Sequence, residues 1–138
     1  MPRLEKWSLK QSSDGKGYLK GFIYNDEKNR FPDGLSVHTS AVISALDDDH
    51  VMTRNTAYEL GGADEEYEKL FPDAKKRLIK NLRVQGWAAL FRRINQDLVD
   101  KGEEEQVVPF TDIEFYTEQL RNLDCKEPEE IAQAMAKL

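Results

Sequence analysis

Hydrophobic and polar positions alternate with two different periods along the chain. Over residues 17–62, aromatic and β-branched side chains recur at every second position between turn residues, which is typical of half-buried strands. From residue 63 onward, the apolar positions are spaced by threes and fours, as on one face of an amphipathic helix. The change of period predicts an α+β fold, in which an N-terminal antiparallel sheet or a small SH3-like barrel is followed by about four α-helices that pack on it.

Strands are predicted over four stretches that turn residues separate, namely residues 4–9, 18–24, 35–45 and 51–60. In the second stretch, Tyr18, Phe22 and Tyr24 share one face of the strand. Gly21 lies in the middle of this strand and indicates a bulge, a bend or a close neighbour. Both a plain meander and a partly closed barrel are compatible with strands of this number and length.

The third predicted strand is the longest, because its alternation continues for eleven residues. Val37, Thr39 and Ile43 fall on its apolar face, and a bend is expected near Ser40. Three aspartates at residues 47–49 form the turn that follows. Like charges at such a turn resist edge pairing with another chain.

Helical periodicity follows the sheet. Asp64 is predicted to cap the first helix, and Tyr67, Leu70 and Phe71 are expected to form its inward face. Pro72 is expected to break the segment, because proline is favoured in a new first turn. The next helix carries a broad apolar stripe that is predicted to form the centre of the core: Leu78, Ile79, Leu82, Trp87, Leu90, Phe91, Ile94 and Leu98.

Two shorter helices are predicted after a charged connector at residues 100–106. Thr111 and Glu114 have the spacing of a capping box at the start of the first one, and Pro128 opens the second. Between the connector and the capping box, residues 107–110 form an extended segment that predicts an edge strand.

Length and composition limit the organisation of the chain. Its 138 residues predict a single domain over residues 1–138, with a β-rich part at 1–62 and a helical part at 63–138. Cys125 is the only cysteine, which excludes an internal disulfide and an all-cysteine metal site and fits a reducing compartment. The first residues lack the apolar segment of a secretory signal, and no apolar run approaches the ~20 residues that span a bilayer. We therefore expect a location in the cytoplasm of a bacterial or infected host cell, without membrane contact.

Charge is distributed unevenly around the formal net charge of −6. Residues 74–96 contain seven basic side chains and no acidic one, whereas residues 97–138 contain twelve acidic and four basic side chains. One interpretation is that acidic and basic faces of neighbouring helices neutralise each other. The other is that each region presents a charged surface to a partner.

Signals for catalysis and for metal or cofactor binding are weak. The chain has two histidines, His38 and His50, that could activate a nucleophile. Neither candidate nucleophile, Ser40 or Cys125, lies in a known nucleophile motif. The carboxylates of residues 47–49 lack the spacing of a calcium loop, and no glycine-rich loop is placed to bind phosphate. The sequence therefore predicts no enzyme, no cofactor and no metal site. A small hydrolase or nuclease remains only as a third hypothesis, with a site that the sequence does not reveal.

Two sets of residues are candidates for binding. For a protein partner, Phe31 is a possible exposed anchor, and the acidic helices can present a phosphate-like pattern to a basic groove; this set comprises Phe31, Asp33, Glu103, Glu104, Glu105, Glu114 and Glu118. For nucleic acid, basic residues of the long helix together with the sheet face can follow a phosphate backbone; this set comprises Lys75, Lys76, Lys80, Arg83 and Arg54.

The β-region also resembles a known group of proteins. The pattern consists of WSL at 7–9, GFIY at 21–24, RFPDG at 30–34, TS at 39–40, TRNT at 53–56 and YELG at 58–61. It is similar to a pattern in small uncharacterised proteins of bacteriophages and bacterial mobile elements, over residues 7–82 only. Residues 26–29 and the chain after Arg83 depart from it. The resemblance implies an accessory protein that acts inside a bacterial cell, and it assigns no functional residues.

The first functional hypothesis is therefore a non-enzymatic protein–protein interaction module, an accessory protein that inhibits a host defence protein by covering its surface. Its partner would be a host or bacterial protein. The alternative is a nucleic-acid-associated protein that uses the basic helix at residues 75–93. The sequence leaves the oligomeric state open.

Overall fold

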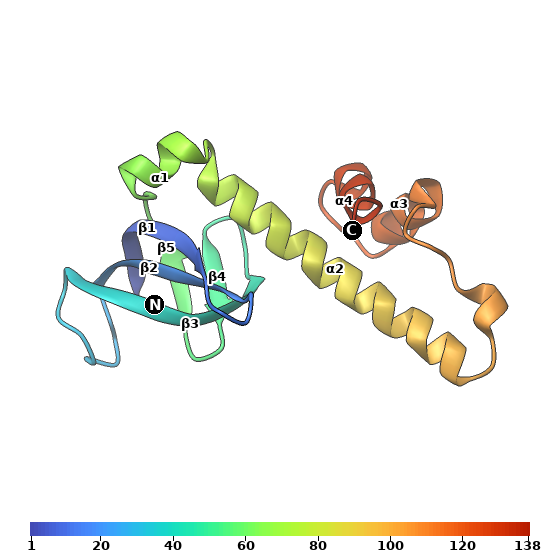
Figure 1. Cartoon of the computed structure of the whole chain (residues 1–138), viewed down its shortest axis with the longest axis horizontal. Coiled ribbons are helices and arrows are strands. Elements are labelled where there is room, and N and C mark those ends of the chain that lie inside the picture. Colours follow the sequence, from blue (N-terminus) through green and yellow to red (C-terminus); the bar gives the residue numbers. More distant parts are fainter. The chain divides into compact units, whose positions relative to one another are not determined.

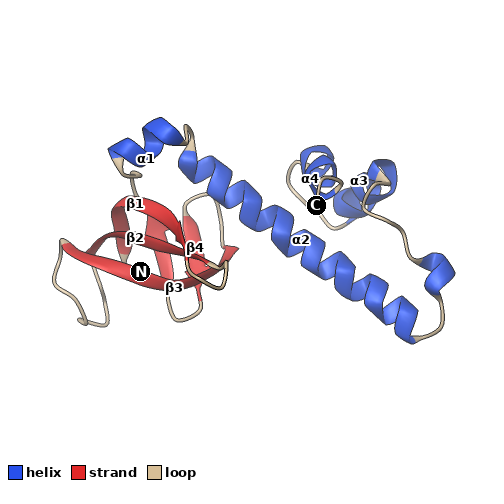
Figure 2. Ribbon diagram, in the orientation of Figure 1, coloured by secondary structure: helices blue, strands red, loops and turns tan.

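The computed structural model describes residues 1–138 and divides them into two compact units, Met1–Leu82 and Arg83–Leu138 (Figure 1). The first unit contains β1 (Arg3–Gln11), β2 (Gly17–Tyr24), β3 (Leu35–Ala45), β4 (His50–Thr53), β5 (Ala57–Leu60) and α1 (Glu65–Leu70). The long helix α2 (Ala74–Asp100) begins in the first unit and ends in the second. The second unit also contains the 3-10 helix η1 (Glu104–Gln106), α3 (Ile113–Asn122) and α4 (Pro128–Met135). Figure 2 shows that all strands belong to the N-terminal part of the chain.

The five strands close into a barrel in the order β1-β2-β3-β4-β5. Each strand is antiparallel to the next one. Because the number of strands is odd, the last strand runs in the same direction as the first, and the seam that closes the barrel is parallel. At this seam Arg3 lies opposite Glu59 and Leu4 opposite Leu60. The predicted α+β class, with a small SH3-like barrel followed by about four helices, is confirmed.

The predicted strand at residues 51–60 is in fact two strands, which a tight turn separates. The backbone amide of Thr53 donates to the carbonyl oxygen of Thr56 at 2.9 Å. The Thr53 hydroxyl donates to the same oxygen at 2.7 Å, and it accepts from the Thr56 amide at 3.1 Å. A buried threonine thus closes the turn, although its β-branched side chain is typical of a strand interior.

The inward-facing residues of β3 change from odd-numbered to even-numbered positions along the strand. Ile43, which was expected to point inward, is 59% exposed, whereas Val42 packs against the core. The register between β2 and β3 shifts between Tyr18 and Lys20. At this shift the Thr39 hydroxyl, instead of a backbone carbonyl, accepts from the Leu19 amide at 2.9 Å. The irregularity moves the inward face of the strand by one residue, which strict alternation does not reveal.

Gly21 has the close neighbour that its place in the strand indicates. A methyl group at its Cα would lie 3.1 Å from the carbonyl oxygen of Glu5 and 3.2 Å from Cα of Trp7. The register of β1 against β2 shifts between Glu5 and Ser8, and the intervening Lys6 has a left-handed backbone with φ of 50°. This β-bulge brings the β1 backbone against Gly21 and sends Leu4 and Trp7 into the barrel interior.

Buried apolar side chains form two clusters. The cluster of the first unit joins the barrel interior to the start of α2: Leu4, Trp7, Leu19, Ile23, Val37, Val51, Tyr58, Leu60, Ala74, Leu78 and Ile79. The cluster of the second unit joins the remainder of α2 to α3 and α4: Val84, Ala88, Phe91, Tyr116, Leu120, Ile131, Ala132 and Met135. Two residues of the predicted stripe, Leu90 and Ile94, are exposed instead. That the chain is one domain stays a prediction.

The helix ends follow local chemistry. Asp64 caps α1, as predicted, and its carboxylate accepts from the Tyr67 amide at 3.2 Å. Leu70 and Phe71 are exposed, so the prediction that they face inward is wrong. The reason is the shortness of α1, whose six residues present only Tyr67 to the barrel, at 6.1 Å between its ring and that of Trp7.

The chain from 107 to 115 differs from the sequence-based prediction. The helix α3 is capped by Asp112, which accepts from the Phe115 amide at 3.1 Å, and not by a capping box that begins at Thr111. Residues 107–110 form no strand, and the carbonyl oxygen of Val108 accepts from the Tyr116 hydroxyl instead. None of the helices combines the length and the apolar composition that crossing a bilayer requires.

Candidate functional site

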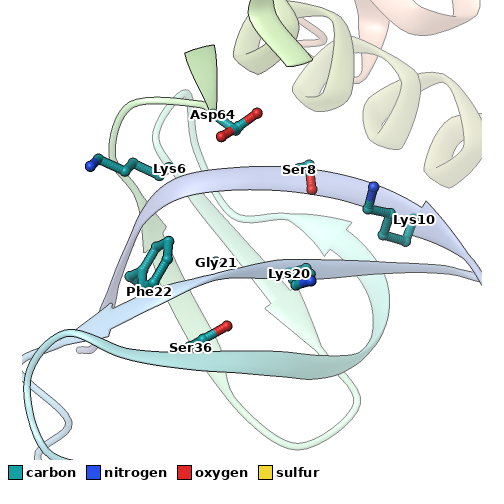
Figure 3. Close-up of a pocket in the computed structure, with 8 residues that line it drawn as sticks. All are labelled: Lys6, Ser8, Lys10, Lys20, Gly21, Phe22, Ser36 and Asp64. Carbon is teal, nitrogen blue, oxygen red and sulfur yellow. The ribbon is translucent and has the colours of Figure 1, made fainter. Parts of the chain in front are cut away.

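A shallow hollow of about 290 Å³ lies on the outer face of the barrel (Figure 3). Three lysines, two serines and one phenylalanine dominate its lining, which comprises Lys6, Ser8, Lys10, Lys20, Gly21, Phe22, Ser36 and Asp64. Strands β1, β2 and β3 supply all of these residues except Asp64, the residue that caps α1. The hollow therefore belongs entirely to the first unit.

Strand register brings these side chains together. Lys20 of β2 lies opposite Ser8 of β1 and opposite His38 of β3. Phe22 lies opposite Ser36, and Tyr18 lies opposite Lys10. Because alternate residues of a strand point to the same side, Tyr18, Lys20 and Phe22 line up along one outward face.

The bulge in β1 adds Lys6 to this face. Leu4 and Trp7 are both fully buried although they are three positions apart, so the two residues between them both lie on the outer side. The left-handed backbone of Lys6 redirects its side chain, as bulges commonly do. In Figure 3, Lys6 and Phe22 lie at the same end of the hollow, with the Lys6 nitrogen directed outward, and Lys10 lies at the other end.

Aromatic rings alternate with the lysines. Phe22 is 38% exposed, which is unusual for a phenylalanine of a barrel strand. The rings of Tyr18 and His38 stack at 5.7 Å between centroids, with 17° between their planes. We name the set of Lys6, Lys10, Tyr18, Lys20, Phe22 and His38 the basic–aromatic face. Such a face can attract an anion through its ammonium groups and stack against a planar group through its rings.

One acidic residue, Asp64, lines the hollow, and a second, Glu5, lies opposite Phe22 in the register and pairs with Arg3. The carboxylate of Asp64 accepts from the Tyr67 amide and so is engaged in capping α1. Three lysines therefore line the hollow together with one carboxylate that already has a hydrogen-bond donor. The net charge of the residues that line the hollow is positive, although the chain as a whole has a net charge of −6.

The basic residues predicted from the sequence do not line this hollow. Lys75 donates to the carboxylate of Asp49 at 3.0 Å, which partly neutralises its charge. Lys76, Lys80 and Arg83 lie along α2 at spacings of four and three residues, so they share one side of that helix. Arg54 is exposed in the turn between β4 and β5, and its backbone amide donates to the carbonyl oxygen of Ala41.

Phe31 lies on an ordered loop, and it is 37% exposed. The buried carboxylate of Asp26 accepts from the backbone amides of Arg30 and Phe31, at 2.8 and 3.1 Å. It also binds the Arg30 guanidinium, with 3.2 Å between Nη2 and Oδ1. The hydrogen bond from the Arg30 side chain is the main reason why the pKa of Asp26 lies below its usual value. The guanidinium of Arg30 in turn covers the Phe31 ring at 5.5 Å.

The other residues predicted to bind a protein lie in different places. The carboxylate of Asp33 accepts from the Asn25 amide at 2.9 Å, which closes the loop that presents Phe31. The acidic residues all belong to the second unit, where Glu103 precedes η1, Glu104 and Glu105 form it, and Glu114 and Glu118 share one side of α3. Four of these five glutamates are exposed, and Glu103 is half-buried.

His50 and Cys125 have structural surroundings. Asp47 accepts from the backbone amides of Asp49 and His50, and these bonds, with one to the His50 ring, lower its pKa. Burial raises the pKa of the Cys125 thiol, which disfavours the reactive thiolate. No group of three or more histidine, cysteine or acidic side chains is arranged to hold a metal ion.

Comparison with known proteins found no family model, no curated protein and no solved structure that matches the chain. The resemblance to proteins of bacteriophages and mobile elements therefore stays a prediction.

Lys6, Lys10 and Lys20 are functional candidates that the sequence did not single out. They are dispersed over two strands, and none has a basic neighbour in the sequence that would mark a cluster. A usable signal was present in β2, where Lys20 alternates with Tyr18 and Phe22 on the outward face.

Proposed function

We propose that the chain is a non-enzymatic nucleic-acid-binding protein whose barrel provides the binding surface. The observation that carries this proposal is the basic–aromatic face, where Lys6, Lys10 and Lys20 are brought together with an exposed phenylalanine. Phosphate groups supply most of the affinity of such complexes, and lysines are their usual partners. The alternative hypothesis from the sequence thus becomes the first, although its site is now on the barrel alone and no longer includes the basic residues of α2.

The net charge of the chain does not oppose this function. Salt screens the interaction between exposed charges beyond about 8 Å at physiological ionic strength. A ligand in the hollow therefore responds mainly to the three lysines around it rather than to the net charge of −6. Favourable contacts of this kind weaken as salt is added, because binding releases the counterions of the phosphates.

Reversing the charge of Lys10 and Lys20 together is expected to weaken nucleic-acid binding by about tenfold or more, because two attractive contacts become repulsive. The measurement is fluorescence anisotropy of a labelled oligonucleotide of twenty thymidines, at low and at moderate salt. The slope of log affinity against log salt should also become shallower, by about 0.7 for each phosphate that the variant no longer neutralises.

The matched control carries the same change of charge elsewhere in the first unit. Lys16 and Lys28 are exposed lysines of loops, and they do not line the hollow. Lys16→Glu with Lys28→Glu should retain most of the affinity. If the control loses as much as Lys10→Glu with Lys20→Glu, or if the unaltered protein binds no nucleic acid at low salt, the proposal is wrong.

A second candidate function is binding of a host or bacterial protein through the loop at residues 26–34, as an accessory protein that inhibits a defence protein in the cytoplasm. The observation that favours it is the ordered presentation of Phe31, since aromatic anchors on rigid supports are common at protein interfaces. Pull-down from a bacterial lysate should retain one stoichiometric protein, and Phe31→Ala should lose it. If the unaltered protein and Phe31→Ala capture the same amount of the partner, this role of the loop is contradicted.

A further inference from the structure

We propose that the basic–aromatic face binds single-stranded nucleic acid, with bases stacked on Phe22 and on the Tyr18–His38 pair while Lys6, Lys10 and Lys20 contact the phosphates. This inference rests on the proposed function and specifies the class of nucleic acid. It follows from the aromatic members of the face, which phosphate binding alone does not require.

The rings are available for stacking. The side chain of Phe22 does not belong to the core cluster of the barrel, and it is 38% exposed. The rings of Tyr18 and His38 stack against each other on the same side of the barrel, so a base would stack on an outer face of this pair. Stacking of a base on an aromatic side chain is tolerant of sequence, because every base has a π-face. We therefore expect weak sequence preference.

The spacing of the rings favours a strand whose bases are separated. Tyr18 and Phe22 are four residues apart on β2, which corresponds to about 13 Å at the rise of a β-strand. Neighbouring bases of a duplex are only about 3.4 Å apart and stacked on each other. Bases that stack on Tyr18 and on Phe22 at the same time must therefore be unstacked from each other and separated along an extended strand.

The hollow also suits a base better than a double helix. Its volume of about 290 Å³ lies at the lower end of the range for small-molecule pockets. Bases within a duplex are paired and stacked, so their faces cannot reach Phe22 or Tyr18. Lys20 lies between Tyr18 and Phe22 in the register, where it can contact the backbone that joins two separated bases.

The experiment compares four probes of equal length with the same label: oligodeoxyuridine, oligouridine, a DNA duplex, and an abasic sugar–phosphate strand. At least one of the two single strands should bind ten times more tightly than the duplex and the abasic strand, and the preferred sugar identifies the ligand as DNA or RNA. Phe22→Ala should weaken binding to this strand by about 5- to 100-fold, with an unchanged salt slope and unchanged binding to the abasic strand.

Phe31→Ala is the matched control, because Phe31 is an equally exposed phenylalanine of the first unit outside the hollow. It should bind the single strand like the unaltered protein. Circular dichroism checks the fold of each variant, and Phe22→Leu, which keeps an apolar side chain without a ring, replaces Phe22→Ala if the latter does not fold.

Each alternative result overturns the inference in a distinguishable way. If the duplex or the abasic strand binds as tightly as the single strands, and Lys10→Glu with Lys20→Glu abolishes this binding, the proposed function holds and the single-strand inference fails. If Phe22→Ala instead loses a protein captured from lysate while no probe binds, the face is a protein interface and both proposals fail.

Discussion

Replacing Trp7 by alanine is expected to lower the free energy of unfolding of the first unit by about 3–5 kcal/mol. The side chain of Trp7 is fully buried, and it is the largest one in the core of the barrel. Its Nε1 donates to the carbonyl oxygen of Gly61 at 2.9 Å, across the parallel seam. The substitution therefore leaves a cavity and also removes a hydrogen bond that helps to close the barrel.

Urea titration followed by far-ultraviolet circular dichroism measures this effect, since the variant loses a fluorescent probe. Hydrogen exchange of the amides of β1 and β2 assigns the loss to the barrel. Trp7→Phe keeps an aromatic ring and should cost less than Trp7→Ala. Lys28→Ala, at an exposed loop position, should change the stability by no more than about 0.5 kcal/mol. A loss below about 1 kcal/mol for Trp7→Ala would contradict the central place of this side chain.

In the second unit, Tyr116→Ala is expected to have an effect of similar size, about 3–5 kcal/mol. The ring of Tyr116 is buried, and ring centroids lie 5.0 Å away in Phe91, 5.2 Å away in Phe110 and 5.0 Å away in Phe115. Its hydroxyl donates to the carbonyl oxygen of Val108 at 2.5 Å. Removal of the side chain therefore disrupts the aromatic cluster that joins α3 to α2.

The control for this prediction is Tyr116→Phe, which keeps the ring. The Val108 carbonyl oxygen retains a donor, because the side-chain amide of Asn95 also donates to it at 3.3 Å. We expect Tyr116→Phe to cost only about 0.5–1.5 kcal/mol, as for a single hydrogen bond. Hydrogen exchange of the α3 and α4 amides distinguishes the two variants. Equal losses for both would show that the hydroxyl, and not the ring, stabilises this unit.

Features of the fold that depend on local chemistry were predictable. The alternation of β2, the cap at Asp64 and the break at Pro72 each depend on a few adjacent residues. The exposure of Ile43 was not predictable in the same way, because it follows from the register shift of β3 against β2, where the Thr39 hydroxyl accepts from the Leu19 amide. The exposure of Leu70 likewise depends on where α1 ends, which its apolar spacing does not specify.

The candidate site was less accessible from the sequence than the fold. Basic residues concentrated in one helix are conspicuous in a sequence, so the nucleic-acid hypothesis was based on the spacing of Lys76, Lys80 and Arg83. The lysines of the hollow are separated by up to fourteen positions in the sequence and come together only through the register of β1 and β2. Gly21 indicated a bulge, a bend or a close neighbour, but it did not specify that Lys6 of the facing strand would turn outward.

The parallel seam has a consequence for how the barrel is made during synthesis. It joins residues near the N-terminus to residues more than fifty positions later, through backbone hydrogen bonds from Glu59 to Pro2, from Gly61 to Leu4 and from Asp64 to Trp7. Contacts so distant along the chain make folding slow, since the entropy of closing a long loop is lost before the contacts form. A nascent chain that has not yet exposed residues 59–64 outside the ribosome therefore cannot form this seam, and its first strand keeps an unpaired edge until they emerge.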